Sequence, residues 1–440
     1  MPLKNGQRLS AYWLAAATLL SLVCYYQLFY QTPRTDLSGI LVYFLVLALV
    51  YILIIRVVPQ ALLYWALAAA VLLRLFALPA IPELSDDFFR FIWDGRLLNQ
   101  GISPFAELPS TLMQDPIFNG NPVNQQLFQG MNSPDYFTVY PPLAQWIFFV
   151  PSWLFPDNIL GNLMVMRLVI ILFEIGSMVL CLKILKQSAL PSGNVLIYAW
   201  NPLVVVELTG NLHFEAVMIF FVLLAIHLWQ INRWKWSASA LAAGVAVKLI
   251  PLIFLPLLIL RKPWRQVIFY WIICGVVIGL LFATIWSPEL SEGMRSSLGL
   301  YFQKFEFNAS VYYLVREIGY AIKGYNIIQT AGLYLALVTL LTILWLSWST
   351  PDKLTWPQAM IWALTIFLLM STTVHPWYIT TLVALAVFTN YRFPLAWSIL
   401  VILSYAGYSE SGYSENLWLV TTEYLLLSVV IILDLRNSLT

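Results

Sequence analysis

The sequence carries little charge and few of the motifs that mark nucleotide or metal enzymes. Only 10% of its 440 residues are charged, and 23 basic against 21 acidic side chains leave a net charge of +2. A charge this small, scattered along the chain, argues against a nucleic-acid partner. No glycine-rich phosphate loop or Walker pattern is present, which argues against ATP-driven transport. The cysteines Cys24, Cys181 and Cys274 fall in apolar segments at unrelated spacings, so neither a disulfide framework nor a cysteine metal site is indicated.

What the sequence has in excess is hydrophobic residues. They make up 61% of the chain, with 19 tryptophans and a mean hydropathy of +0.80. A soluble core cannot hide this much apolar surface, so an integral membrane protein is indicated. We predict one all-α polytopic domain over residues 1–440 with about 11–14 transmembrane segments. The predicted full spans are 12–30, 38–57, 61–79, 165–182, 195–208, 214–229, 267–285, 327–348, 358–373, 377–388, 395–405 and 418–433. Prolines should break two further segments, 141–155 and 237–260, into re-entrant or bent half-helices.

The positions of lysine and arginine predict the orientation of the chain. Lys4 and Arg8 place the N-terminus in the cytoplasm, because short cytoplasmic loops hold an excess of basic residues. Three spans later, residues 80–142 form a long extracytoplasmic loop, residues 286–325 form a second one, and the C-terminus lies in the cytoplasm. The first apolar stretch lacks a small-residue cleavage site and is expected to remain as a span. We therefore expect a multi-pass protein of the cell membrane, a bacterial inner membrane, with its polar chemistry on the extracytoplasmic side.

The most charged segment reads IPELSDDFFRFIWDGRLLNQGISPF. Ser85 has the character of a helix N-cap, and Asp86 and Asp87 then lie in the first turn, where the helix dipole favours carboxylates. Arg90 is one helical turn from an acid on either side and can pair with one of them. The interleaved aromatic residues predict an amphipathic helix over about residues 85–100, lying at the membrane interface. Such a helix can be purely structural, or it can carry a catalytic carboxylate at its exposed first turn.

Several motifs resemble the GT-C superfamily of membrane glycosyltransferases. SDDFFRFIWDGRLLNQGISPF lies in the long early loop, and YPPLAQ lies at the end of that loop. NPLVVVELTGNLHFEAVMIFFVLLA, AVKLIPLIFLPLL and HPWY follow. The similarity extends from Ile81 to about Tyr378 and is greatest to bacterial polyprenyl-phosphate-mannose-dependent mannosyltransferases and to the GPI mannosyltransferase I type. The acidic motif is an adjacent aspartate pair here, whereas relatives vary between DxD, DE and DD forms.

The resemblance implies transfer of a sugar, mannose or another hexose, from a polyprenyl-phosphate donor to an extracytoplasmic glycan or lipid acceptor. A carboxylate would take the proton of the acceptor hydroxyl as it attacks the anomeric carbon, and polar groups would stabilise the departing phosphate. The resemblance points to Asp87 as this base, with Asp86 orienting it or substituting for it. The expected contacts to the donor phosphate or substrate are Arg90, Tyr140, Lys248, His375, His213 and Glu215. No metal or other cofactor is expected, because side chains can hold a lipid monophosphate, although a divalent metal is the alternative.

Most of these residues have a second interpretation. His375 is also typical of a structural histidine beside interfacial Trp377 and Tyr378. Lys248 either snorkels to the surface or approaches the donor phosphate, if the segment 237–260 bends at Pro251. His213 and Glu215 are either acceptor contacts or part of the loop scaffold.

Two other classes of protein share some of these features. A secondary transporter or lipid flippase is also polytopic and has proline-interrupted helices, but the second half of this chain has no counterpart to SDDFFR. An enzyme like an O-antigen ligase or polymerase also acts outside on lipid-linked sugars. The early position of the acidic loop favours the GT-C interpretation over both.

Overall fold

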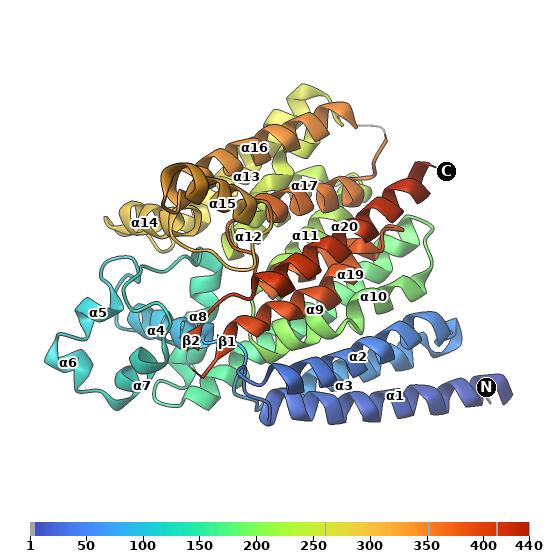
Figure 1. The fold of residues 1–440 in the computed structure, drawn as a ribbon, viewed down its shortest axis with the longest axis horizontal. Coiled ribbons are helices and arrows are strands. Elements are labelled where there is room, and N and C mark those ends of the chain that lie inside the picture. Colours follow the sequence, from blue (N-terminus) through green and yellow to red (C-terminus); the bar gives the residue numbers. More distant parts are fainter. Residues whose placement is uncertain (1–4, 260, 351–352, 411, 440) are drawn as a thin grey trace.

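The protein is almost entirely helical (Figure 1). The computed structural model describes residues 5–259, 261–350, 353–410 and 412–439. The long apolar helices are α1 (Asn5–Tyr30), α2 (Leu37–Val57), α9 (Ile159–Gln187), α13 (Trp264–Ala283), α16 (Ile328–Ser349) and α20 (Leu417–Leu439). Shorter bundle helices are α3 (Leu63–Phe76), α10 (Leu196–Ala199), α11 (Glu215–Gln230), α12 (Trp234–Val247), α17 (Trp356–Met370), α18 (Ile379–Ala386) and α19 (Phe393–Leu400).

The remaining elements connect the bundle helices. Helices in the connections are α4 (Asp87–Asn99), α5 (Pro109–Leu112), α6 (Pro116–Asn119), α7 (Pro122–Gly130), α8 (Pro142–Leu154), α14 (Leu290–Gln303) and α15 (Val311–Lys323). The 3₁₀ segments are η1 (Gln60–Leu62), η2 (Ser192–Val195), η4 (Ile250–Leu258), η5 (Pro376–Tyr378) and η6 (Val401–Gly407), and η3 (Val204–Gly210) is a π-helix. Strands β1 (Tyr408–Ser409) and β2 (Gly412–Tyr413) pair antiparallel, with Tyr408 opposite Tyr413.

The helices define an all-α polytopic membrane protein. Six described helices are long and apolar enough to cross a membrane, and η3 with α11 makes a seventh span if this bent pair is one unit. The described helices long enough to span are therefore fewer than the 11–14 predicted, and four shorter apolar helical segments accompany them. The number is lower because some predicted spans are short and irregular: 377–388 is divided into η5 and α18, and 395–405 into α19 and η6.

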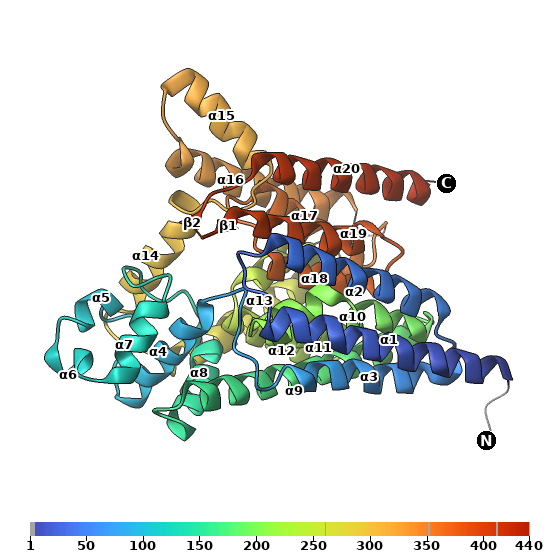
Figure 2. The same ribbon diagram turned by 60° about the horizontal axis from the view of Figure 1, so that its bottom comes forward.

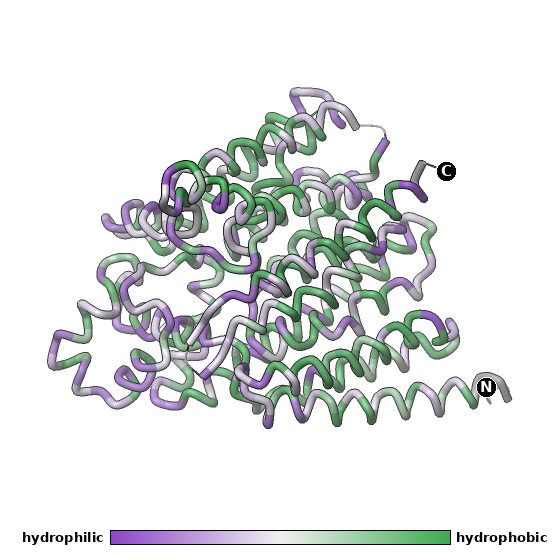
Figure 3. Tube along the Cα trace, in the orientation of Figure 1, coloured by the Kyte–Doolittle hydropathy of each residue, from purple (hydrophilic) through white to green (hydrophobic). Residues whose placement is uncertain are grey.

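The two ends of the chain lie at the same end of the bundle, and most connecting helices lie at the other. Figures 1 and 2 show the labels N and C near the outer ends of α1 and α20, with α4–α8, α14 and the β-hairpin on the opposite side. Figure 3 shows mostly hydrophobic residues along the bundle helices and many polar ones in those opposite segments. We call this second end the loop end; it consists of residues 31–36, 77–158, 284–327, 408–410 and 412–416.

Helix α4 begins at the aspartate pair and is largely buried. Asp86 occupies the N-cap position without a side-chain capping bond, while Ser85 Oγ accepts a hydrogen bond from the backbone N–H of Asp87 at 3.3 Å. The predicted limits are therefore confirmed to within two residues. However, the aromatic side chains pack against protein instead of lying on the interface. Helix α8 approaches so closely that a Cβ atom at Gly95 would lie 2.1 Å from the carbonyl oxygen of Phe148.

Two breaks in the bundle helices bring polar residues together. Helix α12 ends immediately before Lys248, whose backbone is extended (φ −155°, ψ 138°), and η4 follows. The chain bends by 114° between η3 and α11, and Leu212 lies at this bend in the left-handed region (φ 63°). Left-handed non-glycine residues and π-helical turns recur at functional sites. The predicted break in 237–260 is thus confirmed, whereas 141–155 forms one helix, α8, with Pro151 inside its last turn.

Candidate active site

Asp86 and Asp87 are adjacent in sequence but face different partners. Asp86 forms an ion pair with Arg34 from the turn between α1 and α2. The Asp87 carboxylate accepts hydrogen bonds from Tyr140 Oη at 3.3 Å and from Asn132 Nδ2 at 3.4 Å, and 22% of its side chain is exposed. Both carboxylates are partly exposed, but Asp87 is the one that neutral donors orient and that no cation among the described residues neutralises by a direct hydrogen bond, as suits a proton acceptor.

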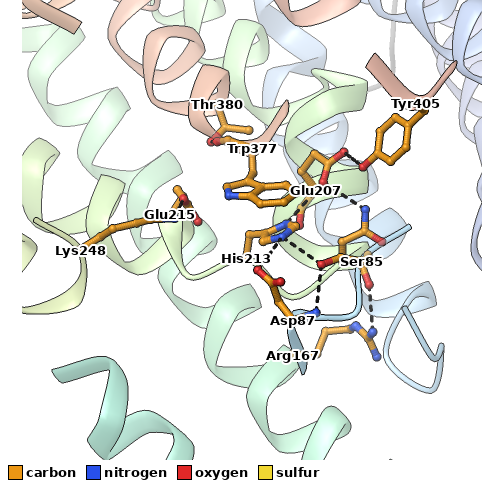
Figure 4. Close-up of polar contacts among 12 residues, drawn as sticks. Ser85, Asp87, Arg167, Glu207, His213, Glu215, Lys248, Trp377, Thr380 and Tyr405 are labelled. Carbon is orange, nitrogen blue, oxygen red and sulfur yellow. Dashed lines mark hydrogen bonds and ion pairs between the residues drawn. The ribbon is translucent and has the colours of Figure 1, made fainter. Parts of the chain in front are cut away.

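His213 faces Asp87 from the turn between η3 and α11 (Figure 4). Its Nε2 atom lies 4.0 Å from Asp87 Oδ2 and 3.4 Å from Ser85 Oγ. On the other side of the ring, Nδ1 lies 2.9 Å from the backbone oxygen of Glu207 and 3.4 Å from its carboxylate. Because these oxygens accept hydrogen bonds, Nδ1 carries a proton and Nε2 is the atom presented to Asp87. The buried Glu207 also accepts a hydrogen bond from Tyr405 Oη at 2.7 Å.

An aromatic stack connects His213 with His375. The ring of Trp377 lies nearly parallel to both imidazoles, with centroids 3.7 Å from His213 and 4.3 Å from His375. Phe307 follows, 4.6 Å from His375, and its backbone pairs with the residues just before His375. Burial lowers the pKa of His375 to about 3, helped by the charge of Lys248 and by His213. His375 is therefore neutral near pH 7 and does not supply a positive charge to a phosphate.

Glu215 and Lys248 form an ion pair between the start of α11 and the break after α12. Glu215 is 1% exposed and Lys248 is 23% exposed, and the ammonium also lies 4.7 Å from the ring centroid of Tyr378. Figure 4 shows this pair beside the loop that carries His213. The two predicted substrate contacts thus lie near the site, but each neutralises the other, as a buried carboxylate requires.

Arg90 supports the fold of the loop end instead of facing the aspartate pair. Its Nε atom donates to Asp94 at 2.7 Å, and its Nη1 atom donates to the carbonyl oxygens of Ser133 and Tyr136 at 3.2 and 2.7 Å. The Arg90 side chain is 5% exposed. Of the two predicted partners, Arg90 therefore uses the later acid, and it ties the start of α4 to the chain that leads to Tyr140.

Buried charges in the bundle hold the backbone around η3. Arg167 donates to the carbonyl oxygens of Thr209 and Gly210 in η3 and to one in the segment before α4. Glu174 accepts hydrogen bonds from Arg74 at 2.8 Å and from the Thr209 hydroxyl. These contacts between helices fix the turn on which His213 lies.

Several residues of the site carry no signal in the sequence. Arg34, Asn132 and Tyr405 belong to segments without a motif and reach the site only through the fold. In the described part of the chain, no group of three or more His, Cys, Asp or Glu side chains comes together as a metal site. Transfer without a metal remains a prediction.

The fold and the site define a polytopic membrane protein with a carboxylate and an imidazole facing each other at one end of its bundle. The model of the family described as "Alpha-(1->6)-mannopyranosyltransferase, N-terminal domain" matches residues 9–262, and the chain belongs to this family. The matched region contains Asp87, Tyr140, His213 and Lys248, whereas His375 lies beyond it. The resemblance to membrane mannosyltransferases is therefore confirmed.

One curated relative is Alpha-(1->6)-mannopyranosyltransferase A of Corynebacterium glutamicum. It is 24% identical over 184 residues, which cover 41% of this chain and 35% of the relative. The chain therefore matches about a third of the length of that protein.

Proposed function

We propose that this protein is a glycosyltransferase that moves a mannosyl unit from a polyprenyl-phosphate donor to a hydroxyl group of a glycan or lipid acceptor at the extracytoplasmic face of the membrane. The family membership and the name of the corynebacterial relative support mannose as the sugar and an α-(1→6) linkage as the product. The geometry around Asp87 is the observation that carries the proposal. Hydrogen bonds from Tyr140 and Asn132 orient this partly exposed carboxylate, which lies at the loop end of a membrane bundle.

In the proposed reaction, Asp87 is the general base. The acceptor oxygen forms a bond to the anomeric carbon, the bond from that carbon to the phosphate oxygen breaks, and the acceptor proton passes to Asp87. The electron pair of the broken bond leaves with polyprenyl phosphate. His213 is a positioning residue, because Glu207 holds its Nδ1 atom and thereby directs Nε2 toward Asp87 and Ser85.

The orientation of the chain fits a lipid-linked donor. A phosphate attached to a polyprenyl chain stays at the membrane surface, so its sugar must be taken up where the bundle meets the interface. The loop end lies opposite both chain termini, which the basic residues near the N-terminus predict to be cytoplasmic. Lys248 with Glu215 and the neutral His375 then form the wall of the site next to His213.

An assay with defined substrates tests the proposal. The purified protein in lipid nanodiscs is given synthetic polyprenyl-phosphate mannose, or the corresponding glucose donor, together with a mannoside acceptor. We expect transfer of mannose and formation of an α-(1→6) bond, read by mass spectrometry and NMR. Transfer from a nucleotide sugar but not from the lipid donor would contradict the proposed donor class.

A further inference from the structure

Arg34 extends the site beyond the loop that carries the aspartates. It lies in the short turn between α1 and α2, and it reaches Asp86 with one guanidinium nitrogen, Nη1. The Arg34 side chain is 35% exposed and that of Asp86 is 27% exposed. Arg34 thus places a cation on Asp86, the residue that precedes the proposed base, from a part of the chain that has no motif.

Tyr408 supports the guanidinium of Arg34 without using its N–H groups. The centre of the guanidinium lies 5.0 Å from the centroid of the Tyr408 ring, in strand β1. A cation over the face of an aromatic ring keeps its in-plane donors available. Only Nη1 has a hydrogen-bond acceptor among the described residues, so the Nε and Nη2 edge of the fork is open.

The other cations near the site are already committed. Lys248 is paired with the buried Glu215. Arg90 is buried, and its Nε and Nη1 atoms donate to Asp94 and to two backbone carbonyls. Its Nη2 atom has no partner among the described residues but is buried, so Arg90 does not offer an accessible donor. His375 is neutral because burial lowers its pKa to about 3. Arg34 is therefore the accessible permanent cation beside the aspartate pair.

We propose that Arg34 binds the phosphate of the lipid-linked donor, and that Asp86 holds this guanidinium in place until the phosphate arrives. The inference rests on the proposed function, since it names a ligand within the same site. A planar guanidinium fork matches two phosphate oxygens, and it keeps its charge at every physiological pH. Both side chains of the pair with Asp86 are about one-third exposed, and ion pairs that solvent reaches are weak enough to be exchanged for a better anion.

The proposal makes opposite predictions for the two partners of one ion pair. Arg34→Gln removes the phosphate ligand, so binding of the donor should weaken about 10-fold or more. Asp86→Asn removes the competing carboxylate, so binding should tighten severalfold. If Asp86 acts through Arg34, the gain should disappear in the double variant, which should bind as weakly as Arg34→Gln. If the pair only fastens the loop, both single variants should instead weaken binding together.

The test measures binding separately from transfer. Tryptophan fluorescence of the protein in nanodiscs is titrated with polyprenyl phosphate, which carries the phosphate and lipid of the donor but no sugar. Arg56→Gln, the same loss of charge at the far end of α2, is the matched control and should bind like the wild type. The melting temperature of each variant reports whether it is folded.

Each result decides for or against the proposal. Weaker binding by Arg34→Gln with tighter binding by Asp86→Asn supports it. Unchanged binding by Arg34→Gln, no binding by the wild-type protein, or equal losses in both single variants would overturn it. If the wild type binds polyprenyl phosphate but does not transfer mannose, the proposed function fails independently of Arg34.

Discussion

The Nε2 atom of His213 lies 4.0 Å from the Oδ2 atom of Asp87, and the indole of Trp377 is stacked against the same imidazole. The relationship joins the start of α4 to the turn between η3 and α11, and through Trp377 to the segment that follows α17. Three separate parts of the chain therefore determine where the proposed base points. We therefore expect substitutions in any of these three parts to lower turnover even where the protein stays folded.

The carboxylate of Glu207 should matter for turnover because it lies 3.4 Å from Nδ1 of His213, in addition to the backbone oxygen of Glu207 at 2.9 Å. In Glu207→Gln the shape and the contact with Tyr405 can persist, but the negative charge beside the imidazole is lost. We expect kcat to fall about 10-fold, with a smaller change in the KM for the donor, because a displaced positioning residue impairs alignment. Tyr405→Phe is the matched comparison, since it removes a hydrogen bond to the opposite carboxylate oxygen, and it should cost less activity. Equal KM and kcat in wild type and Glu207→Gln would show that this contact is only structural.

Lys248 should contribute more to stability than to donor binding. Lys248→Met leaves the carboxylate of Glu215 buried without a counter-charge, and removing one partner of a buried pair typically costs about 3–5 kcal/mol. Thermal unfolding in detergent should show a marked loss for Lys248→Met and substantial recovery when Glu215→Gln is added. A large rise in the donor KM with no change in melting temperature would instead support a direct phosphate contact.

The neutral state of His375 predicts a dependence of stability on pH. Its pKa is about 3 in the folded protein and near 6.5 when unfolded, so the unfolded state binds more protons between these values. The contribution of the neutral imidazole to the free energy of unfolding is fully present above about pH 6.5 and is lost as the pH falls toward 3. Lowering the pH from 7.5 to 5 should therefore destabilise the wild type by about 1–2 kcal/mol more than His375→Gln, measured by thermal unfolding.

Glu415 provides a control of the opposite sign. Burial, with Glu306 nearby, raises its pKa to about 7, so its protonated form favours the folded state at low pH and this contribution is lost as the pH rises through 7. Because this contribution opposes that of His375 between about pH 4.5 and 7, Glu415→Gln should make the loss of stability on acidification steeper than in the wild type. Identical pH profiles for the wild type and His375→Gln would contradict the neutral, buried imidazole.

Gly95 should be required for the position of α4. A methyl group at this residue would overlap the carbonyl oxygen of Phe148, which is backbone and cannot rotate away. Gly95→Ala should push α4 away from α8 and lower both activity and melting temperature. The free energy of unfolding should fall by an amount typical of overpacking, about 1–3 kcal/mol. Gly275→Ala in α13 is the matched control, because nothing lies within 4 Å of the added atom. Comparable melting temperatures for both variants would refute the close packing.

The features that the sequence predicts are local ones. The limits of α4 follow from the acids and the aromatic pattern after Ser85, and the break at Lys248 follows from the prolines of η4. The polar contacts of Arg167 and Glu174 follow the general rule that charges inside apolar helices need partners in the protein.

The features that the sequence does not predict depend on tertiary packing. The spacing of the aromatic residues in α4 is the same whether lipid or helix α8 covers them. The periodicity of the sequence therefore does not predict that α4 is buried in protein. Arg34 lies in the polar turn QTPRTD and Tyr405 lies in η6. Both are distant from Asp87 along the chain, and neither belongs to a motif. From the sequence, Arg90 could pair with either of two acids, because Asp86 and Asp94 are equally far from it along the helix. In the fold it pairs with Asp94, and it also donates to the carbonyl oxygens of Ser133 and Tyr136.

The most direct test is transfer by Asp87→Asn, measured with polyprenyl-phosphate mannose in nanodiscs alongside binding of polyprenyl phosphate. Asn keeps the shape of the side chain and caps helices about as well as Asp, so the variant should insert, fold and bind the lipid. It lacks the proton acceptor, so transfer should fall about 100-fold or more. Wild-type transfer by Asp87→Asn would contradict the assignment of the base, and wild-type transfer by the double variant Asp86→Asn/Asp87→Asn would exclude the aspartate pair from the chemistry.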